Sequence, residues 1–354
     1  MIVSDEFIIS KAPKSKLGSI SLENAPFGKY FTDHMLEVDY EDGEWKTVEI
    51  KPYEPISIEP SLAALHYGQS IFEGVKAYKN KDGEARIFRP EDNFKRFNIS
   101  AERMVMPTVP EHIFIEGMKQ LVKLDEKWIP SKPDHSLYIR PFMFNSEEVI
   151  GVKPGGKFKF MIILSPTGPY YNAPMRIYVE EKYVRAVPGG VGYAKVAGNY
   201  AAAMYATAEA KSKGYDQVLW TDAFDHKYVQ ECGTMNVFFI IGNKAITPGL
   251  DQGTILAGVT RQSTIQLLED LGLEVEERNI SIDEIEEAHR NKQLREAFGT
   301  GTAVTISMIQ ELRHNDYVIE FDVDKWEVAP EVKRRMDAIK DGSAEDKYGW
   351  MVSV

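Results

Sequence analysis

The stretch GGVGYAKVAGNY, residues 189–200, places Lys195 among glycines, alanines and valines, directly before the helical pattern NYAAAMYATAEAKSKG. Lysine is normally kept in water, and an apolar setting disfavours its ammonium form. A neutral lysine amine is a nucleophile suited to carbonyl chemistry. The chain contains 42 Lys and Arg residues, and most such residues are solvated surface groups. An ordinary lysine therefore stays an open alternative until other parts of the sequence are considered.

The composition around this stretch is typical of a soluble globular protein. The chain has 354 residues, of which 43% are hydrophobic, and this is enough for two compact domains. The net charge of −12 argues against a nucleic acid or an anionic membrane as the main partner. The sequence shows no signal-peptide pattern and no long apolar run, so we expect a cytoplasmic protein. Cys232 is the single cysteine, which excludes an internal disulfide and indicates a small apolar filler.

The first half of the chain reads as one α/β domain. Hairpin and strand patterns, several with Asp-Gly turns, cover 34–58, 71–89, 136–144 and 157–166. Helical spacing covers 89–104 and 110–128.

The segment SPTGPYYNAP, residues 165–174, concentrates proline, glycine and asparagine, which block regular structure. We therefore predict an N-terminal domain over 1–165, a connection over 166–175 and a C-terminal domain over 176–354. Beyond the connection, strand patterns occur at 175–181, 216–222, 235–243 and 302–312. Helical runs occur at 199–213, 259–271, 281–289 and 326–340.

Several familiar catalytic signatures are missing from the sequence. It contains no GxGxxG after a strand, no GxxxxGK[ST], no HExxH and no GxSxG. These absences argue against dinucleotide, P-loop, zincin and nucleophile-elbow chemistry. The seven histidines are scattered without ligand spacing on one helix, so we expect no metal.

Three local phrases favour binding of an anionic group. In LAGVTRQSTIQLL a Gly-Val-Thr turn opens an amphipathic helix, which is suited to a phosphate, although an ordinary helix start has the same wording. In VQECGTMNVFFI, Glu231 leads into an apolar strand and needs a protonated partner, unless it reaches water. In FGTGTAV, Thr300 and Thr302 add donors to a flexible backbone, which could equally be a tight turn.

Taken together, ten phrases in order across nearly the whole chain resemble one family. They are FGKYFTDHMLEVDY, LHYGQSIFEGVKAYK, FRPEDNFKRF, LYIRPFMF, LSPTGPYY, YVRAVPGGVGYAKVAGNY, QVLWTD, ECGTMNVFFI, ILAGVTRQS and FGTGTAV. The chain resembles the branched-chain amino acid aminotransferases, which are pyridoxal 5′-phosphate (PLP) enzymes of fold type IV. The resemblance implies an α/β (α+β) two-domain fold with a smaller N-terminal α/β domain and a larger C-terminal pseudobarrel domain. It also implies a homodimer with its active site at the domain interface.

The resemblance gives the conspicuous polar residues roles toward the cofactor. It implies that Lys195 is the catalytic residue, which holds PLP covalently and then moves a proton between the substrate Cα and the cofactor. Glu231 would face the pyridine nitrogen, and Tyr200 would donate to the phenolic oxygen. For the phosphate it implies Arg96, the amides of Val259 and Thr260, and the region of Thr302. Arg89 fits the phosphate motif less well than Arg96, and Arg185 is expected in the surrounding shell.

The substrate pocket must accept a branched apolar side chain in one half-reaction and the glutamate carboxylate in the other. The resemblance implies an aromatic box whose polar tips, with Arg140, receive the carboxylate. The aromatic residues of this box are Phe27, Tyr67, Tyr138 and Tyr170. Tyr67 and the amides near Thr302 and Ala303 would hold the α-carboxylate, and the region of Val152 would reach the active site of the partner subunit.

The resemblance implies reversible ping-pong transfer of the amino group between leucine, isoleucine or valine and 2-oxoglutarate. The partners are then small amino acids and 2-oxo acids. Some animal members carry a Cys-x-x-Cys pair where this chain has Val304 and Ser307, so thiol regulation of that kind is not expected. D-amino acid aminotransferases and 4-amino-4-deoxychorismate lyases share the lysine, the glutamate and the phosphate cradle, and they remain as alternatives. A non-catalytic PLP-binding protein is the alternative from another class.

Overall fold

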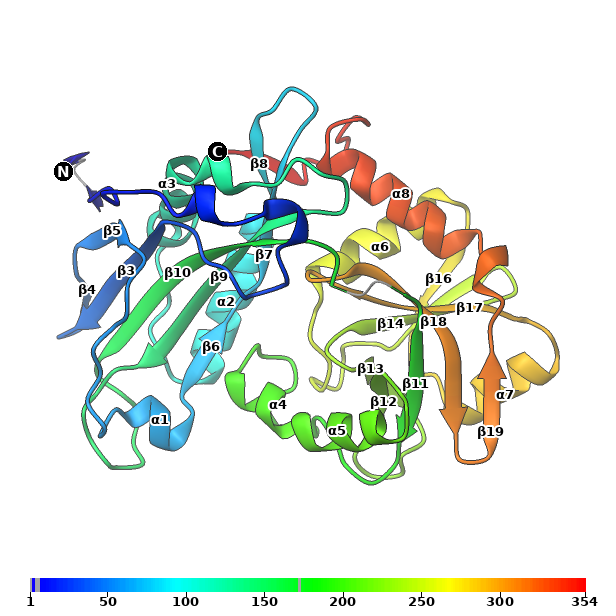
Figure 1. Cartoon of the computed structure of the whole chain (residues 1–354). Coiled ribbons are helices and arrows are strands. Elements are labelled where there is room, and N and C mark those ends of the chain that lie inside the picture. Colours follow the sequence, from blue (N-terminus) through cyan, green and yellow to red (C-terminus); the bar gives the residue numbers. More distant parts are fainter. Residues whose placement is uncertain (1, 4–6, 171–172) are drawn as a thin grey trace. The chain divides into compact units, whose positions relative to one another are not determined.

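The computed structural model describes residues 2–3, 7–170 and 173–354, and the chain forms two compact units (Figure 1). The first unit comprises Met1–Tyr170, Lys195–Ala197 and Ala338–Val354, and the second comprises Tyr171–Ala194 and Gly198–Asp337. Two segments that the sequence analysis assigned to the C-terminal domain therefore belong to the first unit. Residues 171–172 of the predicted connection lie outside the described residues.

Long-range backbone pairing explains both segments. The backbone N–H of Phe72 donates to the carbonyl of Lys195 at 3.1 Å, which ties 195–197 to the first unit. The C-terminal strand β20 pairs antiparallel with β8, from Met351 opposite Phe88 to Ser353 opposite Arg86. Neither pairing leaves a signal in local periodicity, because the paired residues are more than 100 positions apart.

The first unit is built on a mixed sheet, in which the described residues form eleven strands. Its order is β1-β2-β5-β3-β10-β9-β7-β8-β20, with β4 on β3 and β6 on β9. The long strands β9 and β10 pair over their whole length, as predicted for 136–144 and 157–166. The strands are β1 Ile2–Val3, β2 Phe7–Ile9, β3 His34–Glu41, β4 Glu44–Trp45, β5 Val48–Pro52, β6 Ser70–Phe72, β7 Val75–Lys79, β8 Ala85–Phe88, β9 Ser136–Asn145, β10 Phe158–Thr167 and β20 Met351–Ser353.

Helix α2, Pro90–Arg103, carries one buried face against this sheet. Proline at the first helical position suits the start, since its missing N–H has no partner there. The buried residues Asn93, Arg96, Phe97, Ser100 and Ala101 follow the spacing of one helix face. The ring of Phe97 lies 5.5 Å from that of Phe160 in β10. The unit also contains the short helix α1, Ala63–Tyr67, and 3₁₀ turns at Leu17–Ser19 and Leu22–Asn24.

The helix predicted over 110–128 is divided into three parts. A π-helical turn covers His112–Glu116, α3 covers Gly117–Leu124, and a 3₁₀ turn covers Glu126–Trp128. Asp125 ends α3, and its carboxylate instead accepts from the backbone N–H of His34 at 3.0 Å and lies 2.6 Å from His34 Nδ1. This buried pair competes with continuation of the helix.

The second unit contains the expected pseudobarrel. Within the described residues its nine strands follow the order β13-β12-β11-β18-β17-β14-β15-β16, with β19 on β18. A β-bridge between Cys232 and Met235 closes the tight turn that leads from β13 to β14. The strands are β11 Met175–Glu180, β12 Gln217–Thr221, β13 Val229–Cys232, β14 Asn236–Ile241, β15 Lys244–Thr247, β16 Glu274–Glu277, β17 Leu294–Gly301, β18 Thr305–His314 and β19 Tyr317–Glu320.

Apolar strand side chains such as Ile177, Leu219 and Phe239 pack into one core cluster of this unit. Cys232 belongs to the same cluster and is completely buried. Burial, with a smaller contribution from the neighbouring charge of Glu231, raises the pKa of its thiol to about 12. The prediction that Cys232 is an apolar filler is confirmed.

Helices cover the second sheet on its outside. Helix α5 packs against β11 and β12, α6 packs against β16 and β17, and α7 packs against β17. The run predicted over 199–213 is interrupted at Ala203, which separates α4 from α5. The helices are α4 Ala197–Ala202, α5 Met204–Ser212, α6 Val259–Asp270, α7 Ile282–Arg290 and α8 Val328–Lys340, with a 3₁₀ turn at Val323–Lys325. No described helix is both long and apolar enough to cross a membrane.

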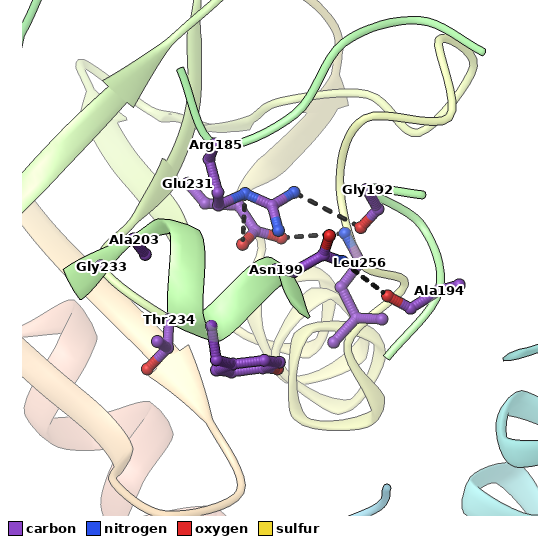
Figure 2. Close-up of a pocket in the computed structure, with 10 residues that line it drawn as sticks. Arg185, Gly192, Ala194, Asn199, Ala203, Glu231, Gly233, Thr234 and Leu256 are labelled. Carbon is purple, nitrogen blue, oxygen red and sulfur yellow. Dashed lines mark hydrogen bonds and ion pairs between the residues drawn. The ribbon is translucent and has the colours of Figure 1, made fainter. Parts of the chain in front are cut away.

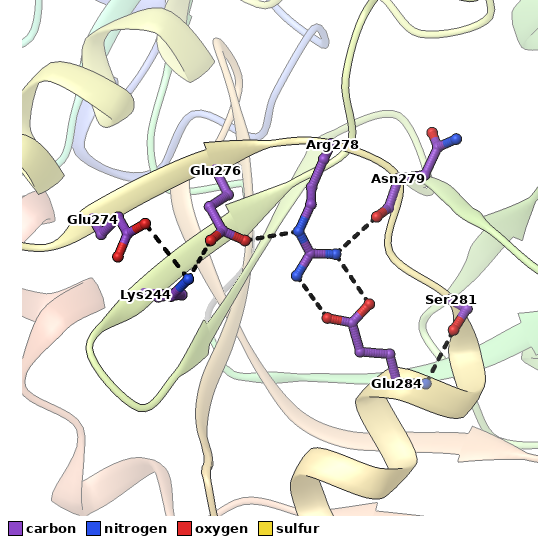
Figure 3. Close-up of polar contacts among 7 residues, drawn as sticks. All are labelled: Lys244, Glu274, Glu276, Arg278, Asn279, Ser281 and Glu284. Atoms are coloured by element: carbon purple, nitrogen blue, oxygen red, sulfur yellow. Dashed lines mark hydrogen bonds and ion pairs between the residues drawn. The ribbon is translucent and has the colours of Figure 1, made fainter.

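A chain of charged side chains ties β15 and β16 to the start of α7 (Figure 3). Ser281 caps α7 by accepting from the backbone N–H of Glu284 at 3.1 Å. Arg278 donates to Glu284 at 2.6 and 3.0 Å and to Glu276 at 2.7 Å, and Glu276 also pairs with Lys244. Hydrogen bonds that the Arg278 guanidinium donates to Glu284 outweigh the effect of burial and raise the pKa of Arg278. Because these groups are partly exposed, the ion pairs contribute little to the free energy of unfolding. Their main effect is to fix the orientation of α7.

His314, the last residue of β18, links three elements through two carboxylates. Its Nδ1 lies 2.6 Å from Glu286 in α7, and its Nε2 lies 3.1 Å from Glu181, which follows β11. Burial alone would lower the pKa of the imidazole, but the hydrogen bonds to Glu286 and Glu181 outweigh it and raise the pKa of His314.

We expect the contribution of His314 to stability to depend on pH. A raised pKa in the folded state means that the stabilisation is complete below the ordinary histidine pKa of about 6.5 and is lost as the pH rises through the folded value. His314→Gln should therefore cost about 1 kcal/mol near pH 6 and less near pH 9. Urea unfolding across this range checks it. His289→Gln, whose partner is the Tyr317 hydroxyl rather than a carboxylate, is the control. An equal cost at both pH values would contradict the prediction.

Candidate active site

Backbone contacts within the first unit hold Lys195 in place. Its N–H donates to Ser100 Oγ at 2.9 Å, and its carbonyl accepts from the N–H of Phe72 at 3.1 Å. The next residue, Val196, forms a β-bridge with Ile71. The position of the Lys195 backbone is thus fixed without any help from its own side chain.

The side chains of Lys195 and Arg140 both lie close to the aromatic ring of Phe72. Lys195 Nζ lies 4.9 Å from the centre of the Phe72 ring, and Arg140 Cζ lies 4.6 Å from the same centre. Both distances are within the range of cation–π attraction. The neighbours Ala194 and Val196 are buried as predicted, whereas Lys195 itself is only half-buried. Sequence reasoning missed Phe72, whose only signal was its place in the phrase SIFEG.

Four residues predicted for the substrate pocket form one cluster in the first unit. The ring of Phe27 meets those of Tyr138 and Tyr170 edge-on, at 4.8 and 5.1 Å. Arg140 Nη2 donates to the Tyr138 hydroxyl at 3.0 Å, because the two residues are two positions apart on β9 and share a face. Gly74 leaves room for that hydroxyl, since a Cβ at Gly74 would overlap it. The cluster therefore combines apolar ring faces with a guanidinium and hydroxyl groups.

Two other predicted residues are outside this cluster. Tyr67 ends α1, is 41% exposed, and has its ring 6.1 Å from that of His66. Val152, in the connection between β9 and β10, is 89% exposed, and the nearby Ile150 is 71% exposed. Exposed apolar side chains of this kind are available for contacts with another molecule.

Arg96 lies on the buried face of α2 and forms a bidentate ion pair with Glu73. Arg96 Nε and Nη2 donate to the two carboxylate oxygens at 2.7 and 2.8 Å, and the Glu73 side chain is completely buried. The expectation of Arg96 as a phosphate ligand did not include this partner. Arg89 donates to Asp92 at 2.8 Å, and its backbone N–H binds the carbonyl of Trp350 at 2.7 Å. Arg89 therefore anchors the C-terminal strand in this structure.

Glu231 and Arg185 form a second buried ion pair, in the second unit (Figure 2). Arg185 Nε lies 3.2 Å from Glu231 Oε2, and the two side chains are only 8% and 5% exposed. The N–H of Leu256 donates to Glu231 Oε1 at 2.9 Å. Glu231 stands inside the short strand β13, rather than ahead of a strand as its sequence suggested. A guanidinium and a backbone N–H both favour the ionised carboxylate.

This pair lines a pocket in the second unit, whose empty space, open solvent included, is about 360 Å³. Asn199 in α4 donates to the carbonyls of Val191 at 2.9 Å and Ala194 at 3.0 Å, which fixes the glycine-rich segment before Lys195. Sequence reasoning missed this asparagine, although asparagine side chains commonly form hydrogen bonds with the backbone of neighbouring turns. The lining residues are Arg185, Gly192, Ala194, Asn199, Tyr200, Ala203, Glu231, Gly233, Thr234 and Leu256.

Helix α6 begins three residues after the pocket residue Leu256. Gly258 is its N-cap, without a side-chain cap, and the first turn contains no acidic residue. The predicted helix start at Val259 and Thr260 is thus confirmed. An N-terminus of this kind suits an anion, because its backbone N–H groups and its dipole both favour negative charge.

The phrase FGTGTAV is mostly strand, not a flexible loop. Strand β17 runs through Gly301, and only 302–304, which include Thr302 and Ala303, form the turn into β18. Gly299 packs closely against Met235, since a Cβ there would lie 3.0 Å from the end of the Met235 side chain. Thr300 Oγ1 is buried and has no hydrogen-bond partner among the described residues. That hydroxyl is available for a bound polar group or water.

Comparison with known proteins identifies the family of this chain. Residues 70–312 match the family model of the class IV aminotransferases. A probable branched-chain-amino-acid aminotransferase of Staphylococcus aureus is 51% identical over 93% of each chain. The crystal structure of the Escherichia coli branched-chain amino acid aminotransferase matches with a TM-score of 0.75 and 25% identity, over 90% of this chain and 98% of that one. The T.th. branched-chain amino acid aminotransferase complexed with N-(5′-phosphopyridoxyl)-L-glutamate matches with a TM-score of 0.71 and 26% identity, over 89% of this chain and 98% of that one. The chain therefore belongs to the class IV aminotransferases, and within them to the branched-chain amino acid aminotransferases.

Proposed function

We propose that this enzyme transfers the amino group between leucine, isoleucine or valine and 2-oxoglutarate in a PLP-dependent ping-pong reaction. The observation that carries the proposal is the ring of Phe72, whose centre lies 4.9 Å from Lys195 Nζ and 4.6 Å from Arg140 Cζ. An amine and a carboxylate-binding cation are thereby placed at one aromatic ring, next to the cluster of Phe27, Tyr138 and Tyr170. An amino acid with either an apolar or an acidic side chain needs this combination.

The donor set fits PLP at both of its ends. A buried carboxylate that already pairs with a guanidinium, Glu231, suits a protonated pyridine nitrogen, and Tyr200 lines the same pocket. The N-terminus of α6, with the amides of Val259 and Thr260, suits the phosphate. When bound, PLP supplies the electron sink for the charge that develops on the substrate Cα. Lys195 Nζ would hold the cofactor covalently.

Lys195 then has a second task, which is to move a proton. With cofactor and substrate bound, the Nζ amine would accept the proton from the substrate Cα. The ammonium group that results is stabilised where Nζ lies over the Phe72 ring. Phe72 thus lowers the cost of holding the proton at Nζ until it is returned to the cofactor.

The remaining phosphate ligands are proposed from charge and from the family to which the chain belongs. Arg96 keeps its guanidinium buried with Glu73, whose carboxylate compensates the charge. Thr302 lies in the turn after β17, two residues beyond the buried hydroxyl of Thr300. We propose that Arg96 and the Thr302 region complete the phosphate site that the start of α6 provides.

For the substrate, the aromatic cluster would hold the branched side chain and Arg140 the distal carboxylate of glutamate. The hydrogen bond from Arg140 to Tyr138 fixes the guanidinium before any substrate binds. We propose that Tyr67 and the amides near Thr302 and Ala303 hold the α-carboxylate.

Replacing Arg140 with glutamine should damage the glutamate half-reaction far more than the leucine half-reaction. A charge-assisted hydrogen bond contributes roughly 1.5–3 kcal/mol, which is about tenfold to a hundredfold in kcat/KM. The leucine side chain has no charge to lose. Single-turnover measurements of each half-reaction, followed in the visible absorbance of the bound cofactor, separate the two effects.

Tyr138→Phe is the matched control, because it removes the hydrogen bond to Arg140 but keeps the guanidinium charge. Equal losses in both half-reactions for Arg140→Gln would mean that Arg140 serves the fold or the α-carboxylate. A selective loss in Tyr138→Phe alone would assign the carboxylate to the tyrosine hydroxyl.

We also propose that the enzyme works as a homodimer, with the loop around Val152 at the active site of the partner subunit. Support comes from the exposure of Val152, 89%, and of Ile150, 71%, on one loop. Light scattering of the purified enzyme should give the mass of two chains. The mass of one chain would contradict the proposal. The cytoplasmic location stays a prediction from the sequence.

The direct test of the proposed function is a steady-state panel of amino donors with 2-oxoglutarate. Leucine, isoleucine and valine should react, and D-alanine should not. Turnover of D-alanine would favour a D-amino acid aminotransferase, and release of pyruvate from 4-amino-4-deoxychorismate would favour a lyase. Absence of any turnover from protein with bound PLP would favour a non-catalytic PLP-binding protein.

A further inference from the structure

The loop Thr254–Gly258 joins the pocket carboxylate to the start of α6, and side chains from three other segments hold it. Arg185 Nη2 donates to the carbonyl of Thr254. The N–H of Leu256 donates to Glu231 Oε1 at 2.9 Å, and its carbonyl accepts from Asn236 Nδ2 at 2.9 Å. Leu256 is therefore bound on both its N–H and its carbonyl. Any shift of this residue disturbs the Glu231 carboxylate.

Asn236 contacts the loop at a second point, next to the helix start. Its Oδ1 lies so close to Gly258 that a Cβ added there would overlap it. The backbone of Gly258, with φ −68° and ψ 129°, is one that any residue adopts. The glycine is therefore needed for close approach to Asn236 and not for its conformation. Asn236 is itself 6% exposed and begins β14, opposite Thr300 of β17.

One side chain thus controls the geometry of two groups that have separate tasks. Through Leu256 it fixes the residue that binds the Glu231 carboxylate, and through Gly258 it fixes the N-cap of α6. A ligand that is bound at both ends gains affinity only if the two binding groups are held at the correct separation.

We propose that Asn236 is a positioning residue that sets the spacing between the Glu231 carboxylate and the first amides of α6. It thereby allows one cofactor to be held by its ring nitrogen and its phosphate at the same time. This inference rests on the proposed function, since it takes the two ends of PLP as the occupants of these groups.

The test compares PLP with pyridoxal, which has the same ring but no phosphate. Dissociation constants for both are measured from the visible absorbance of bound ligand in wild type, Asn236→Ala, Gly258→Ala and the double variant. In Asn236→Ala the Kd for PLP should rise about tenfold or more, and the Kd for pyridoxal much less. Because both single changes act on one contact, the double variant should weaken PLP binding by less than the product of the two single effects.

Thr247→Val is the matched control. Thr247 Oγ1 donates to the carbonyl of Val237 at 2.8 Å, which is a buried side-chain-to-backbone bond in the same sheet. Loss of this bond should lower the melting temperature of the cofactor-free protein, as Asn236→Ala should, but should leave the ratio of the two Kd values unchanged. Should Asn236→Ala fail to fold, Asn236→Asp keeps the shape and removes the donor to Leu256, and the same change in the ratio is expected.

An unchanged ratio in a folded Asn236 variant would overturn the inference, and so would independent effects of Asn236→Ala and Gly258→Ala. Either result would leave the proposed function intact if the wild type binds PLP and converts leucine. Failure of the wild type to bind PLP would instead contradict the proposed function itself.

Discussion

Replacing Lys195 with alanine is expected to abolish transamination and the covalent link to PLP. The same atom, Nζ, is needed to hold the cofactor and to carry the proton, so we expect a loss of at least about 10⁴-fold in kcat. The variant should fold, because Lys195 is held through its backbone by Ser100 and Phe72. The loss can therefore be read as a loss of chemistry.

Borohydride reduction followed by peptide mapping checks the covalent link. In the wild type the label should be found on Lys195, and in Lys195→Ala no lysine should carry it. Lys213 gives a matched control, since its Nζ also lies over an aromatic ring, at 4.4 Å from the centre of Tyr178, but outside the proposed site. Lys213→Ala should keep both label and turnover. Reduction of the cofactor onto any other lysine would contradict the assignment.

Sequence periodicity predicted the elements whose signal is local. The buried face of α2 and the paired strands β9 and β10 follow directly from spacing in their own residues. The start of α6 follows from the Gly-Val-Thr turn. In each of these cases local preference and tertiary packing favour the same structure.

Pairing between distant segments could not be predicted in this way. The bond between Phe72 and Lys195 joins residues more than 120 positions apart, and it draws a short piece of the later sequence into the first unit. The C-terminal strand β20 does the same. Composition alone places a boundary at 166–175, but it does not reveal that these two later segments belong to the first unit.

The phrase FGTGTAV shows how glycine can mislead. Its glycines indicated a flexible or turning backbone, but Gly299 stands within β17, where a Cβ would lie 3.0 Å from the end of the Met235 side chain. Glycine signals conformational freedom in one context and close packing in another. The sequence contains no mark that separates the two.

The sequence does predict that buried carboxylates at the site have cationic partners. Glu73 stands in an apolar strand phrase, as Glu231 does, and the same cost of burying a carboxylate predicts a cationic partner for it. The structure provides Arg96 for Glu73 and Arg185 for Glu231. Which arginine meets which carboxylate depends on tertiary packing, and so it could not be predicted from position in the chain.

Replacing Glu231 with glutamine should leave PLP bound but lower kcat by about a thousandfold. A carboxylate beside the pyridine nitrogen stabilises the protonated ring mainly when negative charge develops on Cα, so its loss acts on the transition state far more than on binding. Glutamine keeps the size of the side chain. It leaves the buried guanidinium of Arg185 without its charged partner, which should also cost roughly 3–5 kcal/mol of stability.

Glu296→Gln separates the two effects. Glu296 is 2% exposed, and its carboxylate accepts from three backbone N–H groups at the start of α8, those of Glu327, Val328 and Ala329, at 2.7–2.8 Å. This change should lower the unfolding midpoint without a comparable loss in kcat, because Glu296 lies outside the lining of the pocket. The measurements are kcat and the Kd for PLP at a temperature where both variants are folded. A near-normal kcat in Glu231→Gln would remove the pyridine partnership, and the Arg185–Glu231 pair would then be a buried structural ion pair only.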